Sequence, residues 1–142
     1  MIDMDCSLCT PAQEIVLWSD AWCRVIWVDS PDYPGYCRVI LNAHVREMSD
    51  LPEDERQRLM AVVFAVEAAV REVLRPDKVN LASLGNQVPH LHWHVIPRFG
   101  DDPQFPDPIW AAPRRPSSAR GEVGELRQWL ARAVAAFLSP PE

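Results

Sequence analysis

Apolar residues at two different periods divide the chain into expected strands and helices. Five short runs rich in β-branched and aromatic residues predict β-strands over residues 14–18, 22–28, 36–42, 78–84 and 91–96. Apolar residues at helical spacing predict one long helix over residues 51–74 and a C-terminal helix over residues 122–138. Because neighbouring strands are joined by short connections, we expect an antiparallel α+β fold.

The same pattern bounds the domain organisation. A chain of 142 residues is long enough for one substantial core, so we expect residues 1–142 to form a single domain. Its core is expected within residues 1–99. Residues 100–121 carry five prolines and no clear period, which is typical of an irregular segment that wraps over the surface or over a partner.

The net charge of the chain limits the classes of partner that it is expected to bind. Lys and Arg number 14 against 20 Asp and Glu, a net charge of −6, and an acidic surface repels a nucleic-acid polymer. A small phosphorylated ligand is still compatible, because one local pocket can be basic. No apolar run is long enough to cross a bilayer, and the polar, acidic N-terminus does not resemble a signal peptide. We therefore expect a cytoplasmic protein without a membrane partner.

Three of the four histidines lie at alternate positions in the stretch PHLHWHVIPRF, residues 89–99. Side chains two apart on a strand share a face, about 6.5–7 Å apart. The alternation places Leu91, Trp93 and Val95 on one face and His90, His92 and His94 on the other. The apolar face can pack on a core, which leaves the histidines to line a surface or a cleft.

Three interpretations of the histidine face compete. It can be a solvated polar surface, although three of four histidines would rarely gather there by accident. It can be part of a catalytic zinc site, which needs a further ligand from elsewhere because consecutive residues on one face do not readily supply three ligands to one ion. It can also act on phosphorus, since a neutral imidazole is a nucleophile or a base and a charged neighbour can donate a proton.

The histidine pattern is similar to the signature of the histidine triad (HIT) superfamily. The motif is filled by His90-Leu-His92-Trp-His94-Val-Ile, and the resemblance extends from the N-terminal Cys-x-x-Cys to about Phe99. It includes the turn at Asp29, the Pro34-Gly35 pair, and His44. The resemblance implies the HIT-like fold, with a five-stranded sheet, one long central helix and a homodimeric assembly.

The resemblance also implies roles for the histidines. His92 resembles the nucleophile that attacks an α-phosphorus and forms a nucleotidyl-imidazole, with its other ring nitrogen held as N–H by a backbone carbonyl. His94 resembles the residue that contacts phosphate oxygens and assists the leaving group. His90 is the orienting first member, and His44 resembles a fourth histidine that approaches the phosphate from the side.

Substrate-binding residues are implied in the same way. Asp29 resembles the carboxylate that accepts the two ribose hydroxyls, although a simple Asx turn before Pro31 is the competing interpretation. The candidates for binding phosphate oxygens through amide donors are Asn80, Asn86 and Gln87. Gly85 would let the backbone of the Asn86–Gln87 loop approach the ligand closely.

Departures from the motif indicate the branch of the family. Many relatives place Ser or Thr where this chain has Gln87. The Pro97-Arg98 pair after the triad is nearer to the Fhit-like dinucleoside polyphosphate hydrolase branch than to the phosphoramidase branch. His94 is not the glutamine of the enzymes that transfer nucleotides to sugar phosphates, so transfer to water is the expected reaction.

The four cysteines fall into two groups. Cys23 and Cys37 lie in apolar strands and are expected to be buried hydrophobes. Cys6 and Cys9 can be a redox pair, an inert loop or half of a zinc site, because tetrahedral zinc needs two more ligands. The resemblance implies that these could be His44 and His90. Such zinc would be structural, and the chemistry itself would require no cofactor.

These features predict a nucleotide hydrolase or nucleotidyl transferase. It would cleave a P–O or P–N bond at the α-phosphate of a purine nucleotide, of the dinucleoside polyphosphate or nucleoside phosphoramidate type. The reaction would pass through a nucleotidyl-histidine intermediate on His92. The alternatives are a nucleotide-binding regulatory or adaptor protein with little turnover, and a catalytic zinc enzyme.

Overall fold

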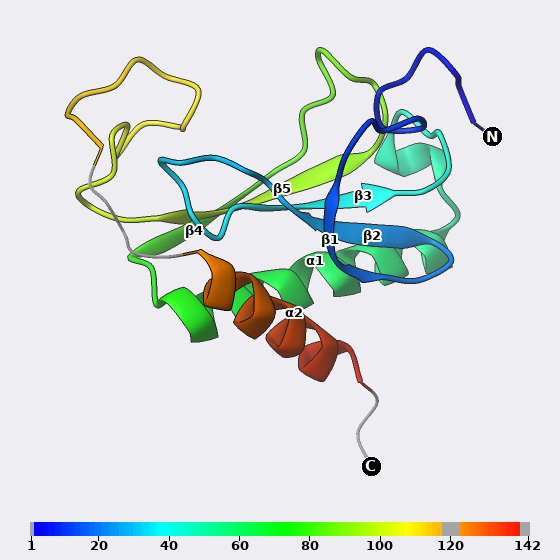
Figure 1. Ribbon diagram of the computed structural model, residues 1–142. Helices are drawn as coiled ribbons and strands as arrows, with labels where there is room; N and C mark the ends of the chain where they lie inside the picture. Colours follow the sequence, from blue (N-terminus) through cyan, green and yellow to red (C-terminus); the bar gives the residue numbers. More distant parts are fainter. Residues whose placement is uncertain (1, 118–122, 140–142) are drawn as a thin grey trace.

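The computed structural model describes residues 2–117 and 123–139, and within them the expected elements form in the expected order (Figure 1). A 3-10 turn, η1 (Met48–Asp50), precedes the long helix. The strands and helices are β1 (Ile15–Ser19), β2 (Cys23–Trp27), β3 (Cys37–Leu41), α1 (Glu53–Leu74), β4 (Lys78–Ala82), β5 (His92–Arg98) and α2 (Gly124–Leu138).

The strands form one antiparallel sheet in the order β1-β2-β3-β5-β4. This confirms the predicted five-stranded α+β fold, with small shifts at element ends. Helix α1 begins at Glu53 rather than at residue 51, because Leu51 and Pro52 have extended backbones. Strand β5 runs on to Arg98, and α2 begins at Gly124, while residue 122 of the predicted helix lies outside the described residues.

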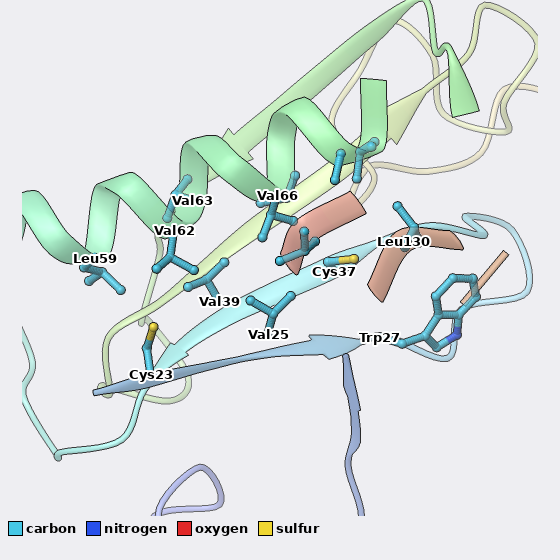
Figure 2. Close-up of a cluster of buried hydrophobic side chains, with 14 of the residues drawn as sticks. Cys23, Val25, Trp27, Cys37, Val39, Leu59, Val62, Val63, Val66 and Leu130 are labelled. Atoms are coloured by element: carbon cyan, nitrogen blue, oxygen red, sulfur yellow. The ribbon is translucent and has the colours of Figure 1, made fainter. Parts of the chain in front are cut away.

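Both helices cover one face of the sheet and enclose the core (Figure 1). Valines at alternate strand positions face the helices, and Figure 2 shows Val25 and Val39 opposite Val62 and Val66 of α1. Cys23 and Cys37 are buried among these side chains, as predicted, and burial raises the pKa of each thiol to about 12. Both cysteines are therefore inert apolar core residues.

Within the described residues, neither α1 nor α2 covers the opposite face of the sheet (Figure 1). The N-terminal segment, the loop of residues 83–91 and residues 99–117 lie on that side (Figure 1). The alternation in β5 explains the division, because Leu91 and Val95 belong to the core and Trp93 packs against it. The histidines between them must then face the side that the loops enclose.

The proline-rich segment is irregular, as predicted, yet it is anchored firmly. Its residues 100–117 form turns, and Arg98 at the end of β5 makes a fully buried ion pair with Asp102, at 2.8 Å between Nε and Oδ2. Tyr33 donates a hydrogen bond to the same carboxylate, and Arg115 donates to the carbonyl oxygens of Asp102 and Phe105. These contacts hold the segment against the end of β5.

Within the described residues, neither helix combines the length and the apolar character needed to cross a membrane.

Candidate functional site

The histidine face forms the centre of the site. Figure 1 places β5 between β3 and β4, and the triad lies at and just before its start. His90 and His94 are buried, whereas His92 is partly open. The rings of His92 and His94 meet edge to face with centroids 5.0 Å apart.

The hydrogen bond of His92 sets the state of its ring. Its Nδ1 lies 2.6 Å from the carbonyl oxygen of His90. A carbonyl only accepts, so Nδ1 must carry the proton and donate it. A neutral His92 therefore has its free lone pair on Nε2. The predicted backbone contact is present, and it leaves Nε2 as the nitrogen of a neutral His92 ring that can accept a proton or attack an electrophile.

His94 is held in a different state. Its Nδ1 lies 2.5 Å from the hydroxyl of the buried Tyr36. Among the described residues, this Nδ1 is the one hydrogen-bond acceptor for the hydroxyl proton of Tyr36. Burial, then the nearby His92 and Arg38, lower the pKa of His94 to about 4. His94 is therefore neutral at pH 7, with Nδ1 accepting and the proton on Nε2, available to a ligand.

A cleft of about 410 Å³ lies over this face. His92 and His94 form its floor, and Asn86, Gln87 and Trp110 are among its walls. Arg38 enters the cleft from β3, where it pairs directly with His94 across the sheet, and its Nε is buried without a partner in the described residues. An unpaired guanidinium nitrogen beside a neutral imidazole makes this a place that favours an anion.

A second cleft, of about 520 Å³, shares the lining residue Arg38 with the first. Asp29 lines it together with Ile26, Trp27 and Ile15, and Arg38 belongs to both clefts. Arg38 therefore joins a region with a carboxylate and apolar side chains to the region with the histidines. This arrangement matches a ligand with a sugar and a flat apolar group at one end and a phosphate at the other.

The predicted site residues separate into four places. Asn86, Gln87, His92 and His94 share the first cleft, and Asp29 lines the second. Asn80 lines neither cleft, and its side-chain oxygen accepts a hydrogen bond from Arg98 at 2.8 Å. His44 and His90 also stay outside both clefts, and they meet the N-terminal cysteines instead.

The side chains of Cys6, Cys9, His44 and His90 converge, with one ligand atom of each lying within 4.8 Å of all the others. Nδ1 of His90 is 3.4 Å from both sulfur atoms and 3.2 Å from Nδ1 of His44. Tetrahedral zinc with two sulfur and two nitrogen ligands needs ligand separations of roughly 3.3–3.8 Å. Four of the six separations among the donor atoms, at 3.2–3.4 Å, lie close to these values, and all six are within 4.8 Å, so the four donors are placed to converge on one zinc ion.

The surrounding hydrogen bonds favour the same ion. Nε2 of His90 lies 2.6 Å from the carbonyl oxygen of Leu41 and must donate to it, which leaves the lone pair on Nδ1 directed at the thiols. Nε2 of His44 lies 3.9 Å from a carboxylate oxygen of Asp3. A hydrogen bond of this kind fixes the tautomer of a zinc-binding histidine, so His90 is prepared as a ligand, whereas the contact of His44 with Asp3 is too long for a hydrogen bond.

Residues 10–101, more than half of the chain, match the HIT domain family. The chain belongs to the HIT family. Solved HIT structures share its fold over most of its length. A histidine triad protein from Marinobacter aquaeolei is 27% identical, with a TM-score of 0.74 over 89% of this chain and 92% of that chain. A histidine triad protein from Bradyrhizobium japonicum is also 27% identical, with a TM-score of 0.71 over 89% and 91%.

A zinc-bound HIT protein from Mycobacterium smegmatis is 26% identical, with a TM-score of 0.69 over 94% of this chain and 96% of that chain. Among curated proteins, the AP-4-A phosphorylase of Mycobacterium tuberculosis is 33% identical over 81 residues, which cover 53% of this chain and 42% of the relative. A bis(5′-adenosyl)-triphosphatase of Saccharomyces cerevisiae is 31% identical over 75 residues, covering 49% and 36%. This HIT chain therefore spans less than half the length of these two curated relatives.

Three residues of the HIT site were not predicted from the sequence. Arg38 lies in an apolar strand, and only the two-residue period and the pairing of β3 with β5 place it beside His94. Tyr36 precedes that strand and reaches His94 through the fold. Trp110 belongs to the irregular segment, where no period indicates a direction. The position of Arg38 could have been inferred from the alternation, but the other two could not.

Metal removal gives the first prediction. We expect purified protein to hold about one zinc per chain, and chelation to lower its melting temperature, because binding energy at such a site contributes to folding. Affinity should fall as the pH is lowered, since thiols and imidazoles must lose protons to bind. Cys9→Ser should lose the metal, whereas Cys23→Ser should keep it. A Cys9→Ser protein with undiminished zinc content would contradict this ligand set.

Proposed function

We propose that this HIT protein cleaves the bond between the α-phosphate of a nucleotide and its leaving group, through a covalent nucleotidyl intermediate on His92. The observation that carries the proposal is the contact between Nδ1 of His92 and the carbonyl oxygen of His90, at 2.6 Å. It leaves the lone pair of His92 on Nε2, in a cleft shaped for an anion. Attack by Nε2 forms a P–N bond while the bond to the leaving group breaks.

The neighbours of His92 support phosphorus chemistry. Arg38 brings a positive charge to the cleft and pairs with His94 across the sheet. The neutral His94 can donate a hydrogen bond from Nε2 to a phosphate oxygen, because Tyr36 occupies its other nitrogen. Donors that are aimed in advance at developing charge are a main source of catalysis. Water then releases the nucleotide from His92 in a second displacement.

The substrate class is proposed from the relatives together with the clefts. The curated relatives are a phosphorylase of AP-4-A and a bis(5′-adenosyl)-triphosphatase, both named for dinucleoside polyphosphates. In this chain, Arg38 lines both the cleft of the histidines and a second cleft with Asp29 and apolar side chains, and this supports a nucleoside beside Asp29. We therefore assign a dinucleoside polyphosphate as the substrate, with the attacked nucleotide's ribose at Asp29.

Zinc is assigned a structural role in this proposal. His90 contacts both the thiols and the backbone carbonyl of Leu41, and its own carbonyl oxygen orients His92. A bound zinc would fix the position of His90 and thereby steady the carbonyl that holds the nucleophile. Because the ligand group uses four protein donors, it leaves no open position for a substrate, in contrast to a catalytic zinc site.

A substrate panel with product identification tests the function. Dinucleoside polyphosphates and nucleoside phosphoramidates are incubated with the protein, and the products are separated. The proposal predicts release of a nucleoside monophosphate from a dinucleoside polyphosphate. Tight nucleotide binding without turnover of any member would instead support an adaptor. Activity lost on chelation and restored by zinc, with the fold intact throughout, would support a catalytic zinc enzyme.

Asp29 gives the second prediction. A ribose diol donates two hydrogen bonds to one carboxylate, and loss of one leaves that carboxylate partly unpaired, at a cost of about 1–3 kcal/mol. AMP should therefore bind about 5- to 100-fold more tightly than 2′-deoxy-AMP. Asp29→Ala should remove most of this preference and keep phosphate binding, and Asp32→Ala in the same loop is the control. A ribose preference that survives Asp29→Ala would overturn the placement of the nucleoside.

A further inference from the structure

Trp110 is an exposed aromatic residue in the wall of the catalytic cleft. Its side chain is 53% exposed, although it belongs to a segment that is otherwise tied down by buried contacts. Its ring meets the ring of His94 edge to face, with centroids 5.1 Å apart, and both residues line the cleft. A large apolar surface held open beside the reacting groups is suited to a ligand.

The anchoring of the segment fixes Trp110 in this position. The buried pair of Arg98 and Asp102 holds the start of the segment, and Arg115 donates to the carbonyl oxygens of Asp102 and Phe105 from its far end. The backbone amide of Arg114 donates to the carbonyl oxygen of Pro103 at 2.7 Å, which closes the segment into a loop. Trp110 therefore lies on a loop that is closed at its base, and little ordering is left for a ligand to impose.

The two clefts, which share Arg38, offer places for the two ends of a long ligand. Asp29 and its apolar neighbours line one cleft with Arg38, while Trp110 and the equally exposed Leu84 line the other cleft with Arg38 and His92. Ring contacts of 5.0 and 5.1 Å lead from His92 through His94 to Trp110. A ribose with a short phosphate chain can bridge such a separation, so the part of the substrate that leaves His92 can reach the indole.

We propose that Trp110 forms a subsite for the nucleobase of the leaving nucleotide, which stacks on the indole while the attacked nucleotide lies towards Asp29. This inference rests on the proposed function and adds a binding preference for the leaving group of the substrate. Every nucleobase has a flat face that stacks on an aromatic ring, so the subsite accepts a second base without reading its identity. The site thereby favours substrates with a nucleoside at both ends.

Binding to an inactive protein tests the subsite without turnover. In a His92→Asn background, the affinities of diadenosine triphosphate and of ATP are measured by calorimetry, because these ligands share three phosphates and differ in the second nucleoside. Trp110→Ala should weaken binding of the two-base ligand about 5- to 100-fold, the range expected for one stacked base. Binding of ATP should change less than ~2-fold on the same reasoning, since it has no second base to stack.

Two further variants complete the experiment. Trp110→Phe retains a stacking surface and should restore most of the affinity for the two-base ligand. Trp129→Ala removes a comparably exposed indole from α2, on the helical side of the sheet, and should affect neither ligand (Figure 1). Equal weakening of both ligands by Trp110→Ala, or no weakening of the two-base ligand, would overturn the subsite. Failure of the parent protein to bind either nucleotide would overturn the proposed function as well.

Discussion

A His92→Asn protein is expected to bind nucleotides with nearly normal affinity and to lose turnover by at least ~100-fold, as expected when a nucleophile is removed. In the native protein, the hydrogen bond from Nδ1 to the carbonyl oxygen of His90 leaves the Nε2 lone pair free in the cleft. The asparagine side chain keeps a polar group of moderate size but has no nucleophilic nitrogen. The remaining ligand contacts, from Arg38 and His94, are left in place.

The measurement compares kcat and nucleotide affinity in native and variant proteins with equal melting temperatures. Ser83→Ala is a suitable control, because the Ser83 hydroxyl donates to the backbone carbonyl oxygen of His92 at 3.1 Å and does not touch its ring. It should keep turnover within a few-fold of the native protein. A folded His92→Asn protein that retains turnover close to the native value would exclude His92 as the nucleophile.

The largest expected effect on stability belongs to Asp102. Asp102→Asn should lower the free energy of unfolding by about 3–5 kcal/mol, because it leaves the Arg98 guanidinium buried without a counter-charge. Arg98 is 2% exposed and Asp102 is 1% exposed, so water cannot replace the lost interaction. The cost is measured by chemical denaturation. Asp107→Asn, which breaks the exposed pair with Arg114 in the same segment, should have a much smaller effect.

The same carboxylate predicts a dependence of stability on pH. Burial opposes its ionisation, but hydrogen bonds from Arg98 and from the backbone amides of Phe99 and Phe105 outweigh burial and lower the pKa of Asp102 to about 2. Stabilisation from a lowered carboxyl pKa is complete above the ordinary value near 4 and is lost as the pH falls towards 2. Asp102→Asn should therefore reduce the loss of stability between pH 4 and 2. Identical acid denaturation in the native and Asp102→Asn proteins would contradict this assignment.

Most of the fold could be predicted because apolar residues recur at regular strand and helix spacings along the chain. In β5, the strict alternation of apolar residues with histidines determines which side chains enter the core, and the burial of Leu91 and Val95 confirms it. The first and last residues of each helix and strand are harder to predict from the sequence, because they depend on local backbone geometry. Pro52 illustrates this, since it caps α1 with an extended conformation that delays the first helical turn to Glu53.

The site was predictable where a motif carries it and unpredictable where the fold assembles it. Cys6, Cys9, His44 and His90 were grouped through the family resemblance, and the fold brings their ligand atoms together. His44, which was also expected beside the phosphate, meets the thiols instead and lines neither cleft.

Long-range contacts account for the residues that the sequence did not indicate. Tyr36 reaches His94 across 58 positions of the chain, and Arg38 becomes a site residue only through the register between β3 and β5. Asn80 shows the converse, because the fold leaves it outside both clefts, with its side-chain oxygen accepting a hydrogen bond from Arg98. Register and loop anchoring are properties of the folded sheet, which no single segment of sequence specifies.

The stereochemical course at the α-phosphorus tests the central claim most directly. A substrate made chiral at that phosphorus with oxygen isotopes is hydrolysed, and the configuration of the nucleoside monophosphate is determined. Attack by His92 followed by attack by water comprises two in-line displacements, each of which inverts the phosphorus, so the account predicts net retention. Net inversion would show a single displacement by water and would contradict the nucleotidyl-His92 intermediate.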